Sequence, residues 1–63
     1  MTNKFIRRPE VEDLVQLSRS TIYLMIQRGE FPSPVKLGRR AVAWRVTDIE
    51  SWIASRESAE DWV

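Results

Sequence analysis

The sequence contains no cysteine and no histidine. The missing cysteines exclude disulfide bonds, and the two absences together exclude the usual zinc clusters. They also remove two common catalytic side chains, and the chain offers neither a glycine-rich phosphate loop nor a serine with a neighbouring general base. We therefore expect no enzymatic activity, no metal ion and no cofactor.

Long hydrophobic runs are missing as well, because no stretch approaches the roughly 20 apolar residues that a membrane-spanning helix needs. No signal-peptide pattern opens the chain. We expect a soluble cytoplasmic protein without a membrane partner, and the lack of cysteine fits that location. A chain of 63 residues is one domain near the lower limit for independent folding, so its stability must come from packing. The three tryptophans are the expected main contributors.

The net charge is only +1, but the charge is unevenly distributed. Residues 1–56 hold all ten Lys and Arg against six Asp and Glu, which leaves +4. The last seven residues hold three acidic side chains and no basic one. This separation predicts a basic domain over residues 1–57 that binds a polyanion, with an acidic tail over 58–63 lying away from it. The alternative is ordinary solubilising charge.

Residues 18–29 are the stretch around which the rest is organised. Ser18 is suited to cap the start of a helix, and Gly29 is suited to the left-handed conformation just past its end. The apolar residues between them recur three and four apart and should face a core: Ile22, Met25 and Ile26. The other side carries hydroxyl, amide and guanidinium groups, which are what phosphates and base edges bind. We predict that this helix enters a DNA groove.

A shorter helix is predicted ahead of it over residues 9–16. Pro9 suits the first helical position, and acidic side chains follow in the first turn, where they favour the helix dipole. Its apolar positions recur at helical spacing and are closed by a leucine: Val11, Leu14, Val15 and Leu17. Two short helices joined by so tight a turn are typical of a helix-turn-helix. Residues 5–6 form either an extended strand or a contact with this first helix.

The chain after the second helix predicts a small β wing. Two prolines at 32 and 34 hold an extended connector, and Phe31 should fill the core between the helical and β parts. Alternating residues predict strands over 35–37 and 42–45, joined by a hairpin loop that carries two arginines at its tip. The side chains expected to face inward are Val35, Leu37, Val42 and Trp44.

The last element is a third helix predicted over residues 48–57. Thr47 and Glu50 form a capping-box pattern at its start, and Ile49, Trp52 and Ile53 supply its apolar stripe. We expect Trp52 to pack against Trp44 as the aromatic centre of the core. Trp62 either frays with the tail, folds back or meets a neighbouring copy. The order predicts an α+β, mostly α fold, namely a compact winged helix-turn-helix with a two-stranded hairpin wing and a C-terminal helix.

Six short segments carry a further signal: PEV at 9–11, LSRSTIY at 17–23, RGEFP at 28–32, PVKLG at 34–38, VAW at 42–44 and IESW at 49–52. In this combination, residues 7–56 resemble the AlpA family of phage and prophage regulators, which is related to the small excisionases and to MerR-type DNA-binding domains. The resemblance implies a sequence-specific, DNA-binding transcriptional regulator. The alternative that it implies is an excisionase that bends DNA and binds as adjacent copies. Leu24 departs from the family, where this position is commonly Arg or another polar residue.

The predicted contacts with double-stranded DNA lie on the second helix and on the wing: Arg19, Ser20, Thr21, Tyr23, Gln27, Arg28, Lys36, Arg39 and Arg40. The first three lie at the N-terminal end of the second helix, the end that usually approaches base edges. Gln27 and Arg28, further along the same helix, should meet phosphates. The wing arginines should reach the adjacent minor groove or its phosphates, the alternative being a solvated turn. Tyr23 either contacts the DNA backbone or packs in the core. Leu24 either contacts a thymine methyl group or lies at the core edge.

Partners other than DNA are expected too. A domain of this size reads only a few base pairs, so two or more copies should bind repeated half-sites. An integrase or another regulator is a further candidate partner. A different function for the same fold is protein binding, for example as an anti-repressor.

Overall fold

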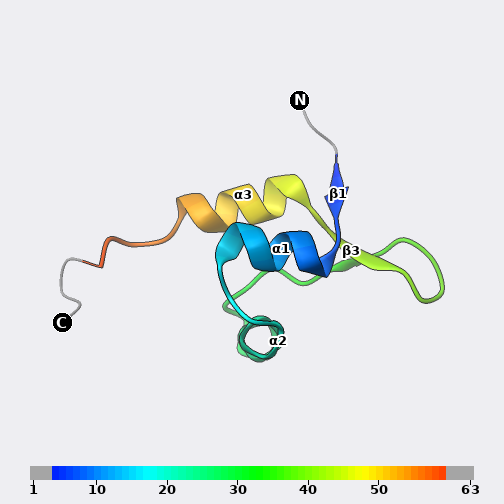
Figure 1. Ribbon diagram of the computed structural model, residues 1–63, viewed down its shortest axis with the longest axis horizontal. Coiled ribbons are helices and arrows are strands. Elements are labelled where there is room, and N and C mark those ends of the chain that lie inside the picture. The colour runs from blue at the N-terminus through cyan, green and yellow to red at the C-terminus, as the bar shows by residue number, and fades with distance from the viewer. Residues whose placement is uncertain (1–3, 60–63) are drawn as a thin grey trace.

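The computed structural model describes residues 4–59. The elements follow in the order β1 (Phe5–Ile6), α1 (Arg8–Val15), α2 (Arg19–Gln27), β2 (Val35–Lys36), β3 (Val42–Arg45) and α3 (Val46–Ala54). In Figure 1, α2 runs nearly along the line of sight below α1, and the loop after β2 projects away from the helices. This arrangement confirms the predicted α+β winged helix-turn-helix. No helix among the described residues has the length and apolar character to cross a membrane.

The sheet has three antiparallel strands in the order β1-β3-β2 rather than the two that were predicted. β1 pairs Ile6 with Trp44, and β2 pairs Val35 with Ala43, so β3 lies in the centre. The open question about residues 5–6 is therefore answered in favour of a strand. β3 passes directly into α3, and the backbone N–H of Val46 donates to the carbonyl of Lys4 at 2.9 Å.

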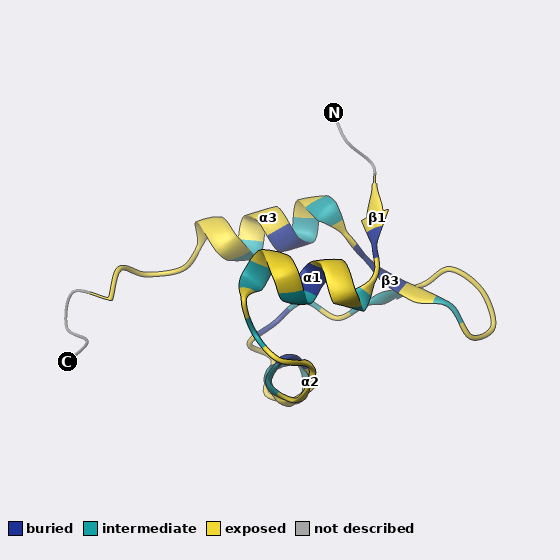
Figure 2. Cartoon of the chain, viewed as in Figure 1, coloured by how far each residue is buried: buried dark blue, intermediate teal, exposed yellow. Residues whose placement is uncertain are grey.

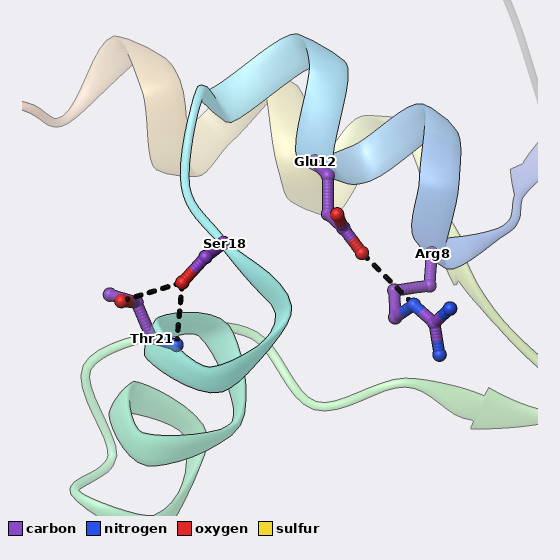
Figure 3. Close-up of polar contacts among 4 residues, drawn as sticks. All are labelled: Arg8, Glu12, Ser18 and Thr21. Carbon is purple, nitrogen blue, oxygen red and sulfur yellow. Dashed lines mark hydrogen bonds and ion pairs between the residues drawn. The ribbon is translucent and has the colours of Figure 1, made fainter.

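The local signals at the helix-turn-helix are confirmed, with shifts of one residue at the ends of α1. The Thr21 backbone N–H donates to the Ser18 hydroxyl at 3.3 Å, so Ser18 caps α2 (Figure 3). Gly29 adopts a left-handed φ of 72° just after α2. The turn between α1 and α2 is made without glycine: Gln16 adopts a left-handed φ of 58°, and its N–H donates to the Glu12 carbonyl at 2.8 Å.

The predicted bounds of the third helix are wrong at both ends. α3 begins at Val46 with Arg45 at the N-cap, which makes no side-chain capping bond, and Thr47 lies inside the first turn. The capping-box pattern is overruled because the chain enters the helix straight from β3, where Lys4 already accepts the first N–H. The helix stops at Ala54, since Ser55 adopts the C-cap position and donates back to the carbonyls of residues 51 and 52.

The core is one cluster drawn from every helix, two strands and the connector: Ile6, Val11, Ile22, Phe31, Trp44 and Ile49. Buried positions are dark blue in Figure 2 and occur on helices and strands alike. Partly buried side chains pack around it: Val15, Leu17, Met25, Ile26, Val46 and Trp52. The predicted inward faces of both helix-turn-helix helices and the role of Phe31 are confirmed, except at Leu14, which is exposed.

Two of the four strand positions predicted to face inward are exposed. Leu37 is 45% and Val42 is 38% exposed, whereas Trp44 is buried and Val35 is half-buried. The reason is that the hairpin projects beyond the helices, so no element covers it there (Figure 1). Ala43 is buried instead. Ile53, which was placed in the apolar stripe of α3, is also exposed.

The aromatic centre differs from the predicted pair. The ring of Trp52 meets Phe31 edge-on, with centroids 4.8 Å apart and planes at 61°. Trp44 instead donates its indole N–H to the Pro32 carbonyl at 2.8 Å, and Trp52 donates to the Glu30 carbonyl at 2.9 Å. Two indoles thus hold the connector on either side of Phe31. Trp62 lies outside the described residues.

Candidate nucleic-acid interface

The side of α2 that faces away from the core is a continuous exposed stripe. It is formed by Ser20, Tyr23, Leu24 and Gln27, which share one helix face because each lies three or four positions from two of the others, and all four are exposed. They lie opposite Ile22, which is fully buried. Because the core holds the apolar side of α2, the polar side is free to enter a groove.

For Tyr23 and Leu24 the sequence left two possibilities open, a contact with DNA or a position in or beside the core. The Tyr23 side chain is 37% exposed, so it is not packed inside the core. The guanidinium carbon of Arg19 lies 6.0 Å from the centroid of its ring. Leu24 is 45% exposed in the middle of the stripe and is not among the side chains packed against the core cluster, and its contact with a thymine methyl group stays a prediction.

Thr21 lies to the side of this stripe and is half-buried. Its hydroxyl accepts a hydrogen bond from the Ser18 hydroxyl at 3.0 Å, while its N–H is bonded to the same oxygen (Figure 3). The Thr21 side chain therefore already takes part in capping α2. Its predicted contact with DNA stays a prediction, and it would use the hydroxyl's own O–H as donor or its remaining lone pair as acceptor.

The remaining predicted residues are cations and an amide on exposed surface: Arg19, Gln27, Arg28, Lys36, Arg39 and Arg40. The two ion pairs of the described chain join Arg8 to Glu12 at 2.9 Å and Arg45 to Asp48 at 3.9 Å. None of the predicted cations forms an ion pair within residues 4–59, so their charge is available to a ligand. No group of Asp and Glu in this part of the chain is arranged to hold a metal ion.

A hollow of about 220 Å³ joins the helix-turn-helix to the wing. Its lining comes from three parts of the chain: Arg7, Arg8 and Pro9 at the start of α1, Tyr23 of α2, and Arg40, Val42 and Trp44 of the wing. Of the predicted contacts, only Tyr23 and Arg40 line it. Tyr23 of α2 and Arg40 of the wing therefore border the same hollow. A larger open groove of about 520 Å³, between residues 29–32 and α3, includes none of the predicted contacts.

Arg7 and Arg8 were missed by the sequence prediction. The signal that could have found them is a pair of adjacent arginines immediately before the helix-starting proline. Only the folded chain brings this pair against Tyr23 and Arg40, because the residues are far apart in sequence.

The comparison with known proteins agrees with the fold. The family model described as prophage CP4-57 regulatory protein (AlpA) matches residues 4–57, a range that contains every predicted contact. An uncharacterized protein of Enterobacteria phage P4, ORF88, is 51% identical over 53 residues, which cover 84% of this chain and 60% of that protein. The chain thus spans somewhat less than two thirds of this relative.

Proposed function

Because this chain belongs to the AlpA family of prophage regulatory proteins, we propose that it is a sequence-specific, DNA-binding transcriptional regulator. In this proposal α2 enters the major groove, and the wing tip reaches the adjacent minor groove or its phosphates. One observation carries it: Tyr23 of α2 and Arg40 of the wing line the same hollow, so a single duplex can touch both elements.

The contacts divide by position along α2. We propose that Arg19 and Ser20, exposed at its N-terminal end, meet base edges, where a guanidinium can bond a guanine with two parallel hydrogen bonds. Tyr23 offers its hydroxyl to the DNA backbone. Gln27 and Arg28 lie one to two turns further on, where the groove wall presents phosphates. On the wing, Lys36 and the tip arginines supply charge without reading sequence.

The same DNA-binding surface would suit a transcriptional regulator or an excisionase, whereas an anti-repressor is the alternative that binds protein. An excisionase-type factor would use the same contacts and bind as adjacent copies on repeated sites. An anti-repressor would instead bind a protein partner and need no steep salt dependence of DNA affinity. Salt dependence therefore separates DNA binding from protein binding, and a footprint with bending assays separates regulator from excisionase.

The experiment enriches duplexes from a random pool on the full chain and measures affinity for an enriched and a random duplex against salt. Each phosphate contact contributes about 0.9 to the slope of log affinity against log salt. Arg39→Ala with Arg40→Ala should lower this slope on both duplexes by up to about 1.8. Arg45→Ala with Arg56→Ala removes the same charge away from the hollow and should leave the slope near the wild-type value.

Two outcomes would overturn parts of the proposal. A wild-type affinity without steep salt dependence would remove DNA as the partner and favour the anti-repressor. An unchanged slope in the wing double variant would remove the wing from the contact surface.

Base reading is tested separately at Arg19. Arg19→Ala should cost about 1–3 kcal/mol on the enriched duplex and much less on the random one, because a bidentate contact to a base is lost. Equal losses on both duplexes would assign Arg19 to the phosphates.

A further inference from the structure

The hollow between α1, α2 and the wing has a composition suited to one kind of ligand. Three of its seven lining residues are arginines, one is a tyrosine, and none is acidic. We infer that Arg7, Arg8 and Arg40 form a seat for a single DNA backbone phosphate, which makes the start of α1 a third DNA-contacting element. This inference rests on the proposed function and adds to it a site that the α2 and wing contacts do not require.

The position of the hollow follows from the shape of a duplex. A major groove and the adjacent minor groove are separated by one sugar–phosphate strand. If α2 occupies the first groove and the wing reaches the second, that strand must pass between them. The hollow lies at this place, since Tyr23 forms its α2 side and Arg40 its wing side.

The size and the floor of the hollow fit a phosphodiester with its sugar. The hollow has a volume of about 220 Å³ and is open to solvent, so a group on the surface of a bound duplex can enter it. Two apolar lining residues, Pro9 and Val42, are exposed and present surface on which a deoxyribose can pack, whereas Trp44 lies almost fully buried behind them. A stacked base inside a duplex cannot reach such a site, whereas the backbone is the outermost part of the DNA.

Arg8 is held ready by its neighbour one turn along α1. Its Nε donates to Glu12 Oε2 at 2.9 Å, which uses one of the five N–H donors of the guanidinium (Figure 3). The terminal nitrogens make no other hydrogen bond within residues 4–59. Glu12 offsets one positive charge, so Arg7 and Arg40 supply the net charge that attracts the phosphate.

The test replaces single phosphates of the enriched duplex by uncharged methylphosphonates, one position at a time. Wild type should lose at least about tenfold in affinity at one position on the strand between the two contacted grooves. In Arg7→Ala with Arg40→Ala, the loss at that position should shrink, because two mutually dependent partners give non-additive effects. Arg45→Ala with Arg56→Ala is the charge-matched control and should keep the wild-type profile.

Two further measurements distinguish loss of the phosphate contact from a folding defect and from failure of the proposed DNA binding. Arg7 is exposed and makes no side-chain capping bond, so Arg7→Ala should leave the far-UV circular dichroism spectrum and the unfolding midpoint unchanged. On a random duplex, this single variant should lower the salt slope by about 0.9. A wild-type chain that binds DNA with steep salt dependence, but whose slope and methylphosphonate profile are insensitive to Arg7, would overturn the phosphate seat alone. A wild-type chain without salt-dependent DNA binding would overturn the proposed function itself.

Discussion

The two tryptophans that hold the connector allow a matched test of what fastens the connector between α2 and β2. Trp44→Phe and Trp52→Phe make the same chemical change, since each keeps a ring and removes one indole N–H. The lost bonds are nearly equal in length, 2.8 Å to Pro32 and 2.9 Å to Glu30. The sites differ in burial, because Trp44 is 1% exposed while Trp52 is half-buried beside solvent.

The expected costs follow from that difference. An orphaned carbonyl costs about 1–3 kcal/mol, and the partial burial of Pro32 favours the lower half of this range. The void left by the smaller ring adds about 0.5–1.5 kcal/mol, by analogy with the loss of a buried methylene group. Trp44→Phe should therefore cost about 1.5–3.5 kcal/mol. Water can replace the exposed bond of Trp52, so Trp52→Phe should cost about 1 kcal/mol.

Those values are large for a domain of this size. At about 0.05–0.15 kcal/mol per residue, 63 residues have a total stability of about 3–9 kcal/mol. Urea unfolding followed by circular dichroism at 222 nm measures both variants without depending on indole fluorescence. The midpoint should fall further for Trp44→Phe with the m value unchanged. A loss for Trp52→Phe equal to or greater than that for Trp44→Phe would refute the reasoning that burial sets the worth of these bonds.

Two more results are expected. Ser18→Ala should lower the free energy of unfolding by about 1 kcal/mol, because the Thr21 N–H loses its acceptor, and Ser18→Gly should cost only a few tenths. Thermal melts compare both variants with wild type, and a Ser18→Ala variant as stable as wild type would contradict the side-chain cap. In the enriched duplex, replacing one thymine by deoxyuridine should weaken wild-type binding but not that of Leu24→Ala, since exposed Leu24 has only a thymine methyl as an apolar partner in the major groove; a wild type indifferent to every such replacement would exclude this contact.

The parts of the fold that could be predicted are those with local causes. Ser18 and Gly29 mark the ends of α2 because capping and left-handed backbone depend on the residue itself. The start of α3 could not be read in the same way. Thr47 carries a valid capping pattern, but a carbonyl more than forty positions earlier, that of Lys4, already occupies the first helical N–H.

The predicted burial of the hairpin positions and the predicted pairing of Trp52 with Trp44 were wrong for a related reason, since both depend on tertiary packing. Alternation at Leu37 and Val42 predicts a strand but does not say how far the helices extend over it. The aromatic partner of Trp52 depends on where the connector returns, and the connector brings Phe31 rather than Trp44 into contact with its ring.

In the candidate site, too, the features with local causes could be predicted and those that depend on tertiary structure could not. The exposed stripe of α2 follows from helical spacing, so Ser20, Tyr23 and Gln27 could be placed from the sequence alone. The hollow between the helix-turn-helix and the wing, by contrast, forms only in the tertiary structure. It joins residues 7–9 to a helix and a hairpin that follow much later, and no local pattern contains that information.

The left-handed Gln16 has a consequence for how the domain meets any ligand of α2. A glycine in this turn would let the two helices sample many relative orientations, whereas a side-chain-bearing residue restricts the unfolded and native backbone alike. The chain accepts a small conformational penalty at this one position while it folds. In return, the orientation of α2 relative to α1 is already fixed before a ligand binds, and little orientational freedom is left to lose on association.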